Sequence, residues 1–151
     1  MITECYIKGW FDYGVGKCAV MIKEGDETVH QVAWKTPDTW QYGGETVQAD
    51  QQNCEILAAT YAMQWCMNNH KSLVNIYANT TTAQKWYLRE DFPESRITMA
   101  KAYCQAVEDY YGSQDVYEGQ PVRDRIYADV IHKDYPNEWK QLVNRLAEQV
   151  K

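Results

Sequence analysis

Several features that mark other protein classes are missing from this sequence. It has no run of eighteen apolar residues, so we expect no membrane-spanning helix. Met1–Gly9 has no long apolar segment behind a basic start, so we expect no signal peptide. The five cysteines contain no C-x-x-C pair and each lies in an apolar segment, which favours small buried side chains in a reducing, cytoplasmic compartment. The three histidines are isolated and give a zinc site little support.

A basic surface is also lacking. The formal net charge is −6, which argues against loose, charge-driven binding of nucleic acid but leaves a site-specific contact open. The segment Thr81–Arg96 holds Lys85, Arg89 and Arg96 against three carboxylates, so it predicts a solvated surface and no phosphate-binding patch.

What is present suits one α/β domain over residues 1–151. Alternating or apolar runs between turn residues predict strands at Thr3–Asp12, Lys17–Lys23, Thr28–Lys35, Leu73–Ala78 and Asp115–Val122. Helices are expected at Asp50–Asn69, at Thr80–Glu90, from the cap Ser95 to Gly112, at Arg123–Asp134 and after the cap Asn137, while Thr36–Gly44 reads as a loop. Short turns make the first three strands antiparallel, and a strand entered through a helix is parallel to its neighbour, so the sheet is mixed.

The helix Asp50–Asn69 is the centre of this pattern. A polar strip of Thr60, Gln64 and Asn68 runs along an otherwise apolar helix, which predicts burial on most sides. Glu55 points away from that strip, into a face of small side chains. Either this first-turn carboxylate bends back to solvent, or it belongs to a polar site built over the sheet.

The order of elements, together with QNCEILAA at residues 52–59, resembles the ribonuclease H fold. The resemblance covers residues 1–134 and leaves a C-terminal helix at 137–151 as an addition. It implies a mixed five-stranded sheet, three strands antiparallel and then two parallel, flanked by helices.

The same resemblance implies four carboxylates that hold two divalent metal ions for phosphodiester hydrolysis. Glu55 matches the carboxylate of the central helix, and Asp129 matches the aspartate expected on the late helix. Lys8 stands where the first strand should carry aspartate, and Asn79 where the fourth strand should end in one. The mobile histidine of the family has no counterpart, because residues 119–121 read Gly-Gln-Pro.

These departures predict a degenerate site. A lysine ammonium within ~4 Å would cost a divalent ion several kcal/mol even at an effective dielectric of about 20. We therefore expect no cofactor; if the protein is active, Mg²⁺ or Mn²⁺ would be bound by Glu55, Asp129 and Asn79. Lys8, Glu55 and Asp129 could instead form only a buried ion-pair cluster. Asp12 could replace the lost aspartate, but it lies about 13 Å further along an extended strand.

The expected function is therefore a ribonuclease H-fold pseudoenzyme that binds a protein partner or structured nucleic acid. The alternative is an active Mg²⁺- or Mn²⁺-dependent nuclease on RNA–DNA hybrids, and a weaker third is an acidic mimic of nucleic acid. Trp34, Trp40 and Tyr42 lie in or beside the expected loop. They are candidate contact residues, unless they only pin that loop to its own domain.

Overall fold

The sheet is built as the alternation of the first strands predicts. The computed structural model describes the chain at residues 2–78, 97–114, 116–117, 120–121 and 129–134, and at residues 145 and 148. The five strands of the main sheet, in chain order, are β1 (Ile2–Asp12), β2 (Val15–Glu24), β3 (Glu27–Lys35), β6 (Leu73–Ala78) and β9 (Asp129–Asp134).

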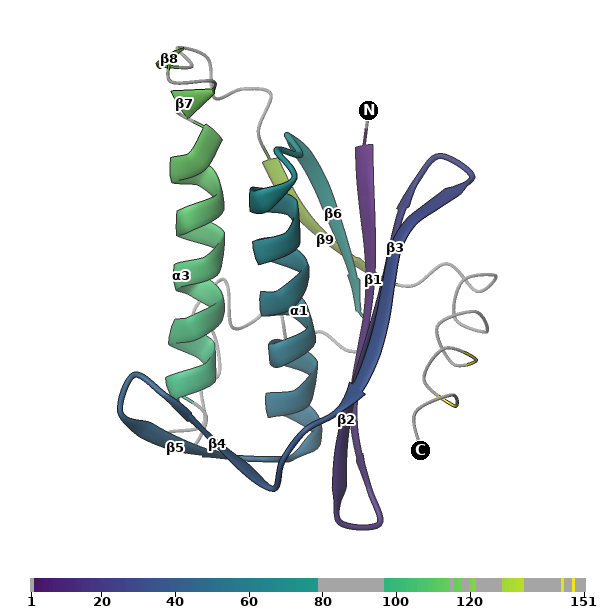
Figure 1. Ribbon diagram of the computed structural model, residues 1–151, viewed down its shortest axis with the longest axis vertical. Helices are drawn as coiled ribbons and strands as arrows, with labels where there is room; N and C mark the ends of the chain where they lie inside the picture. Colours follow the sequence, from purple (N-terminus) through teal and green to yellow (C-terminus); the bar gives the residue numbers. More distant parts are fainter. Residues whose placement is uncertain are drawn as a thin grey trace.

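The strands lie side by side in the order β3-β2-β1-β6-β9 (Figure 1). β1 pairs antiparallel with β2 and β2 with β3, as short turns require, whereas β6 pairs parallel with both β1 and β9. The mixed five-stranded sheet is confirmed, but its last strand is not the expected one. Within Asp115–Val122 the structure describes only the two short strands β7 (Val116–Tyr117) and β8 (Gln120–Pro121), which pair with each other.

The fifth strand of the sheet falls in a segment for which we predicted a helix. Residues 123–134 were expected to be helical, yet 129–134 form β9, so that prediction is wrong for this part. The segment DVIHKD contains two adjacent β-branched residues, Val130 and Ile131, and pairing with the buried strand β6 outweighs its weak helical periodicity. The expected helix at Thr80–Glu90 lies outside the described residues, as does the cap Ser95. Of the expected C-terminal helix the structure describes Arg145 and Glu148, both helical.

Two long helices cover one face of the sheet (Figure 1). The central helix α1 (Gln51–Asn68) begins where the side chain of Asp50 accepts a hydrogen bond from the Asn53 backbone N–H, at 2.7 Å. The second helix, α3 (Ile97–Gln114), packs beside α1 and continues two residues beyond Gly112, where we expected it to end. In the described part of the chain, no helix is long and apolar enough to cross a membrane.

The expected loop at residues 36–44 contains a strand. β4 (Thr39–Tyr42) and β5 (Glu45–Gln48) form a hairpin beside the start of α1 (Figure 1). Gly43 and Gly44 form its turn with φ of 57° and 82°, conformations that glycine adopts without a steric cost. The Gly-Gly pair therefore makes a hairpin out of what sequence inspection reads as an irregular loop.

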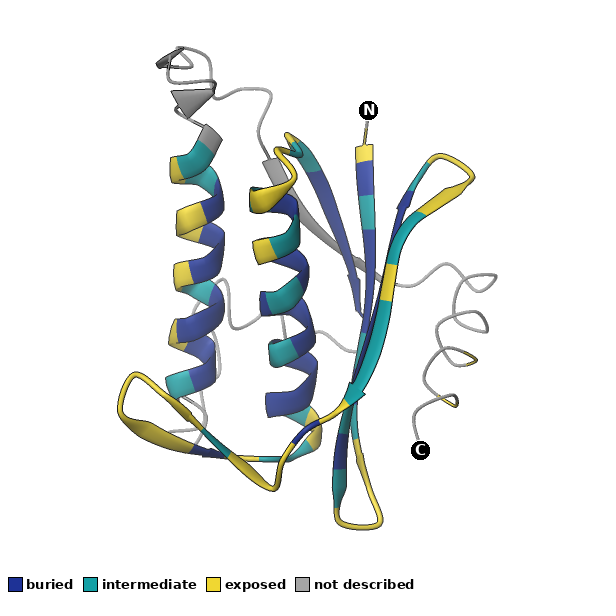
Figure 2. Ribbon diagram, viewed as in Figure 1, coloured by how far each residue is buried: buried dark blue, intermediate teal, exposed yellow. Residues whose placement is uncertain are grey.

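Buried residues line the sheet and the two helices (Figure 2), and they form two apolar clusters. The larger core lies between the sheet and the two helices and includes the fully buried side chains of Ile7, Ile22, Ile56 and Met63. On the opposite face of the sheet, Tyr6, Ala19, Met21 and Tyr77 form a smaller buried cluster. Tyr6 stacks on Tyr77 there, with ring centroids 4.6 Å apart.

Candidate functional site

In the second half of β1, at Gly9, the sheet lies directly against the backbone of α1. A Cβ placed on Gly9 would lie 1.9 Å from the backbone nitrogen of Glu55 and 2.2 Å from the carbonyl carbon of Cys54. Beside Gly9 on β2, the thiol of Cys18 donates a hydrogen bond to the Cys54 carbonyl oxygen, at 3.1 Å. Only glycine permits this approach, so Gly9 fixes Glu55 directly over β1.

Glu55 is fully packed into this junction, since its exposed fraction is 2%. This excludes the expectation that a first-turn glutamate bends back to solvent. A carboxylate is costly to bury unless cations or hydrogen-bond donors meet it. Glu55 is therefore a polar group that the packing of α1 holds in place, which is the arrangement expected of a site residue.

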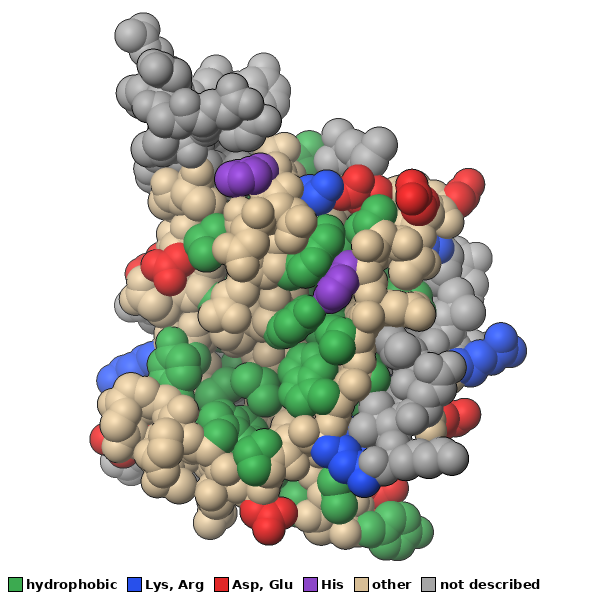
Figure 3. Space-filling model, in the orientation of Figure 1, with side chains coloured by type: hydrophobic (Ala, Val, Ile, Leu, Met, Phe, Trp, Pro, Cys, Tyr) green, Lys and Arg blue, Asp and Glu red, His purple; other side chains and the backbone are tan. Residues whose placement is uncertain are grey.

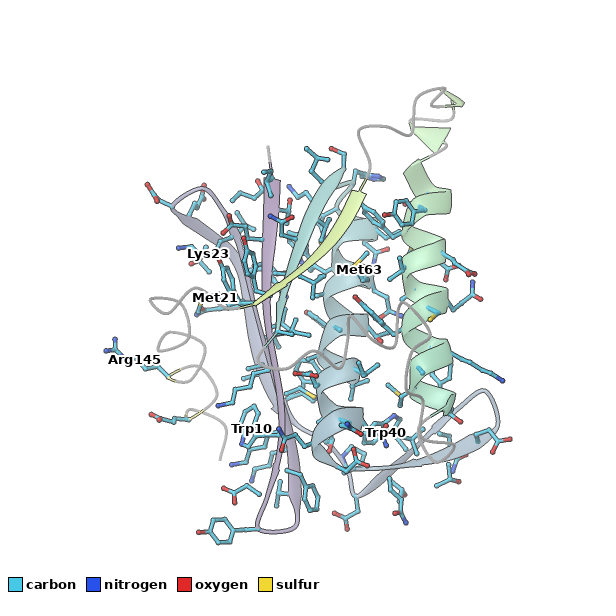
Figure 4. All side chains as sticks on the ribbon, turned by 180° about the vertical axis from the view of Figure 1, so that it is seen from behind. Trp10, Met21, Lys23, Trp40, Met63 and Arg145 are labelled. Carbon is cyan, nitrogen blue, oxygen red and sulfur yellow. The ribbon has the colours of Figure 1, made fainter. Side chains whose placement is uncertain are left out.

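Lys8 belongs to the other face of the sheet. Side chains alternate along a strand, so Gly9 and Ile7 face α1 whereas Lys8 and Trp10 face away from it. The Lys8 ammonium lies 5.2 Å from the centroid of the Trp10 ring, and the ammonium of Lys17, paired with Trp10 across β2, lies 6.0 Å from it. Figure 4 shows Trp10 and Met21 on this face and Met63 on the helix side. We call Lys8, Trp10 and Lys17 together the Lys8–Trp10–Lys17 cluster.

The structure does not bring Asp129 to Glu55. Asp129 begins the strand β9 instead of lying on a late helix; it pairs with Leu73, which pairs with Ile2 of β1. Gly9 is seven residues further along β1, a distance of about 23 Å at 3.3 Å per residue. The backbone position that lies at the site's end of β9 is Asp134, which pairs with Ala78, itself the partner of Ile7.

Two further candidates meet different outcomes. Asn79 follows β6 directly but lies outside the described residues. Asp12 is exposed at the far end of β1, paired with Val15 beside the hairpin turn. The pairing of β1 with β2 continues from Thr3 to Asp12 without a register shift, so no bulge carries Asp12 back towards Lys8.

A two-metal centre does not fit the described residues. Around Gly9 the described residues hold one buried carboxylate, Glu55, and the preceding residue of β1, Lys8, faces away from it. Nowhere in the described ranges do three or more histidine, cysteine, aspartate or glutamate side chains gather as metal ligands. A pair of divalent ions is usually held by several carboxylates between them, and the described residues around Gly9 supply one.

The aromatic contact candidates lie on strands, not in a loop. Trp34 belongs to β3 and Trp40 to β4, and both are partly buried and pack against the main core. The indole N–H of Trp40 is buried without an acceptor among the described groups. Tyr42 is 40% exposed at the end of β4. Two of the three candidates therefore anchor their own domain.

Sequence reasoning missed an aromatic row that joins α1 to β3. The His30 ring lies 5.8 Å from that of Tyr61 and 5.4 Å from that of Trp65, and Trp34 lies 5.3 Å from Tyr61. His30 Nε2 and the Tyr61 hydroxyl are hydrogen bonded at 2.6 Å. The signal was available: Tyr61 and Trp65 are one helical turn apart, and alternate residues of β3 face them.

Several solved structures of ribonucleases H have the same architecture. Over 99% of this chain and 96% of the other, the structure resembles RNase H1 of the halophilic archaeon Halobacterium salinarum, with a TM-score of 0.67 and 14% identity. The N-terminal RNase H domain of a Mycobacterium tuberculosis protein covers 99% of this chain and 98% of its own, with a TM-score of 0.71 and 5% identity. LC11-RNase H1, solved in complex with an RNA/DNA hybrid, covers 98% of this chain and 95% of its own, with a TM-score of 0.66 and 12% identity.

At the level of sequence no family model and no curated protein matches the chain. The likeness to solved structures therefore rests on shape. It shows that the chain has the ribonuclease H-like fold, as the resemblance of its element order and of residues 52–59 predicted.

Proposed function

We propose that this protein is a ribonuclease H-fold binding module that has lost two-metal hydrolysis and binds structured nucleic acid without cutting it. The observation that carries the proposal is the Lys8–Trp10–Lys17 cluster. At the position where the family resemblance expects a metal-binding aspartate, β1 presents a lysine whose ammonium lies against Trp10.

The cluster supplies the two groups that nucleic acid binding uses. Lysine ammonium groups neutralise phosphates, and an indole ring offers a face on which a base can stack. One tryptophan with two cations is a local contact, so it is compatible with a net charge of −6 over the whole chain. One of the structural relatives is seen with an RNA/DNA hybrid, which makes the hybrid the first ligand to test.

The small number of carboxylates near Glu55 supports the proposed loss of hydrolysis. Lys8 replaces the expected aspartate on β1, and Asp129 lies about 23 Å from Gly9 along the sheet. Glu55 alone cannot hold two divalent ions, since each needs several oxygen ligands.

Binding is tested by fluorescence anisotropy with an RNA–DNA hybrid, a duplex RNA and a duplex DNA over a range of salt. We expect Trp10→Ala to weaken binding about tenfold, in line with the stacking contribution of one aromatic ring. Lys17→Gln should weaken binding and reduce the slope of log affinity against log salt by about one. The matched control is Lys101→Gln, which removes an exposed lysine of α3 and should change neither. Equal affinities for wild type, Trp10→Ala and Lys17→Gln would refute this binding surface.

The competing function, an active nuclease, is tested on the same hybrid with Mg²⁺ and Mn²⁺. We expect no cleavage and no shift of the melting temperature by Mn²⁺. Cleavage that is metal dependent and lost in Glu55→Gln would overturn the proposal. In that case Asp134→Asn should abolish cleavage and Asp129→Asn should not, because only Asp134 lies at the site's end of β9.

A further inference from the structure

Two cysteine thiols meet where β1 packs against the last turn of α1. Cys5 lies on β1 and Cys66 on α1; they are 61 residues apart in the sequence, and their Sγ atoms are 3.6 Å apart. Both side chains are fully buried. A disulfide bond is about 2.0 Å long, so the two sulfurs need to approach each other by about 1.6 Å. The fold therefore places two oxidisable groups from distant segments next to each other.

The other cysteines are held differently. Cys18 also lies beside α1, next to Cys54, but its thiol donates a hydrogen bond to the Cys54 backbone carbonyl, at 3.1 Å. Cys104 lies on α3 and is partly exposed. Among the described residues, Cys5 and Cys66 are therefore the pair of thiols best placed to react with each other.

The pair lies close to the surface at one end of the molecule. The start of β1 and the end of α1 lie at the same end (Figure 1), and Asn68, Asn69 and His70, which follow Cys66 closely, are exposed. Figure 3 shows a histidine on the surface there. The ends of helices open at a much lower free energy than the core does. Opening of the last turn of α1 would therefore admit a small oxidant to both thiols.

We propose that Cys5 and Cys66 are a redox-sensitive pair, which a hydroperoxide converts into a disulfide that ties the last turn of α1 to β1. Both thiols are free in the structure, which is therefore the reduced state of the pair. The hydrogen bond with Cys66, together with burial, raises the pKa of the Cys5 thiol. Cys5 stays protonated for this reason, and Cys66 is the first of the two to react.

The oxidation takes place in two steps. The Cys66 thiolate attacks one oxygen of the hydroperoxide; the O–O bond breaks, Cys66 becomes a sulfenic acid, and the other oxygen leaves and is protonated to an alcohol, or to water when the oxidant is hydrogen peroxide. The Cys5 sulfur then attacks the Cys66 sulfur; the S–S bond forms, the S–O bond breaks, and the oxygen leaves as water with the Cys5 proton. The two thiols together lose two electrons, which the hydroperoxide gains.

The disulfide would act on the stability of the fold. It closes a loop of about 60 residues that contains β2, β3 and most of α1, and closure of a loop of this length strongly restricts the unfolded chain. It also prevents the last turn of α1 from opening away from the sheet. The oxidised protein should therefore resist unfolding, with a urea midpoint raised by about 1–2 M.

The experiment uses the full chain in a Cys104→Ser background, which removes the partly exposed thiol. The protein is treated with hydrogen peroxide, then unfolded in urea and alkylated with iodoacetamide either before or after dithiothreitol is added. We expect peptide mass spectrometry to find the peptides of Cys5 and Cys66 joined, and both thiols to be alkylated only after dithiothreitol. The urea midpoint should rise by about 1–2 M and return to its original value on reduction.

Two variants in the same background assign the effect to this pair. Cys66→Ala removes one partner and should abolish the rise of the urea midpoint. Cys18→Ala is the matched control: it removes another buried thiol beside α1 and should retain the rise. Each variant is compared with itself before and after oxidation, so the stability that the substitution costs cancels. Should Cys66→Ala fail to fold, the joined peptides in the parent protein decide the question.

Two results would overturn the inference. If Cys5 and Cys66 stay reduced, or are oxidised separately to sulfinic acids, the two thiols do not react with each other. If a disulfide joins Cys18 to Cys54 instead, oxidation takes place at the other end of α1. Neither result touches the proposed binding of nucleic acid.

Discussion

The contact between Gly9 and α1 leads to the sharpest prediction. In Gly9→Ala the new methyl group would lie 1.9 Å, 2.2 Å and 2.3 Å from the Glu55 nitrogen, the Cys54 carbonyl carbon and the Glu55 Cα. Non-bonded carbon atoms rest at about 3.5–4.0 Å, so α1 must move away from β1 by more than 1 Å. All three atoms belong to helix backbone, and no rotation of a side chain can relieve the clash.

The expected cost is large. Overpacking of a core typically costs about 1–3 kcal/mol. Here a whole buried helix must shift, and a gap of ~1 Å forfeits up to about half of the dispersion energy at each contact it opens. We therefore expect Gly9→Ala to lose at least about 3 kcal/mol. With a urea m-value of about 2 kcal/mol per molar, the denaturation midpoint would fall by roughly 1.5 M.

Gly112→Ala is the matched control. Gly112 is exposed on α3, and a Cβ there would meet no atom within 4 Å. Alanine in a helix is favoured over glycine by about 0.5–1 kcal/mol, so this variant should be slightly more stable than wild type. Urea denaturation followed by circular dichroism measures both. If Gly9→Ala is as stable as wild type, α1 does not lie against β1 as described, and the placement of Glu55 is refuted.

Three further predictions concern local contacts. Asp50→Ala removes the cap of α1 and should cost about 1 kcal/mol in urea denaturation. Tyr61→Phe removes the hydroxyl that is hydrogen bonded to His30 and should cost about 1 kcal/mol in the same assay. The pKa of the Cys5 thiol is raised by its hydrogen bond with a neighbouring thiol and by burial. Iodoacetamide should therefore label the half-buried Cys104 first in the native protein, and Cys5 only after unfolding, as peptide mass spectrometry would show.

Each of these has a control or a contrary outcome. Tyr42→Phe removes a hydroxyl from an exposed ring and should change stability by less than about 0.5 kcal/mol. Asp38 is an exposed aspartate that precedes β4. Asp38→Ala should therefore leave stability unchanged, whereas Asp50→Ala should lower it. Early labelling of Cys5 would show that the contact between the first strand and the last turn of α1 is open in solution.

The extent to which the sequence predicted this structure depends on the kind of signal at each segment. The first three strands, α1 and β6 were predicted to within a few residues, because their periodicity and turn residues agree. The parallel pairing of β6 also follows from the pattern, whereas the pattern left the burial of Glu55 open. β9 was missed because the six residues DVIHKD are too few to show the alternation of a strand. Their strand conformation is instead decided by pairing with the edge of β6.

The candidate site was predicted less well than the fold. Glu55 could be found because a carboxylate on an apolar helix face is an anomaly visible in one dimension. Asp129 was misplaced because it was assigned together with the wrong element, and register decides which end of a strand reaches the site. The Lys8–Trp10–Lys17 cluster depends on two neighbouring strands, so spacing along the chain does not reveal it.

The position of β9 has a consequence for synthesis of the chain. β1, β2 and β3 pair through tight turns and can assemble soon after they leave the ribosome, whereas β6 receives its outer neighbour only when residue 134 has been made. Until then the apolar strand β6 is an unpaired edge strand of a nearly complete sheet, and strands of other nascent chains can pair with it. A stalled or prematurely stopped product ending before residue 129 should therefore aggregate and depend on chaperones, although most of the core is already present.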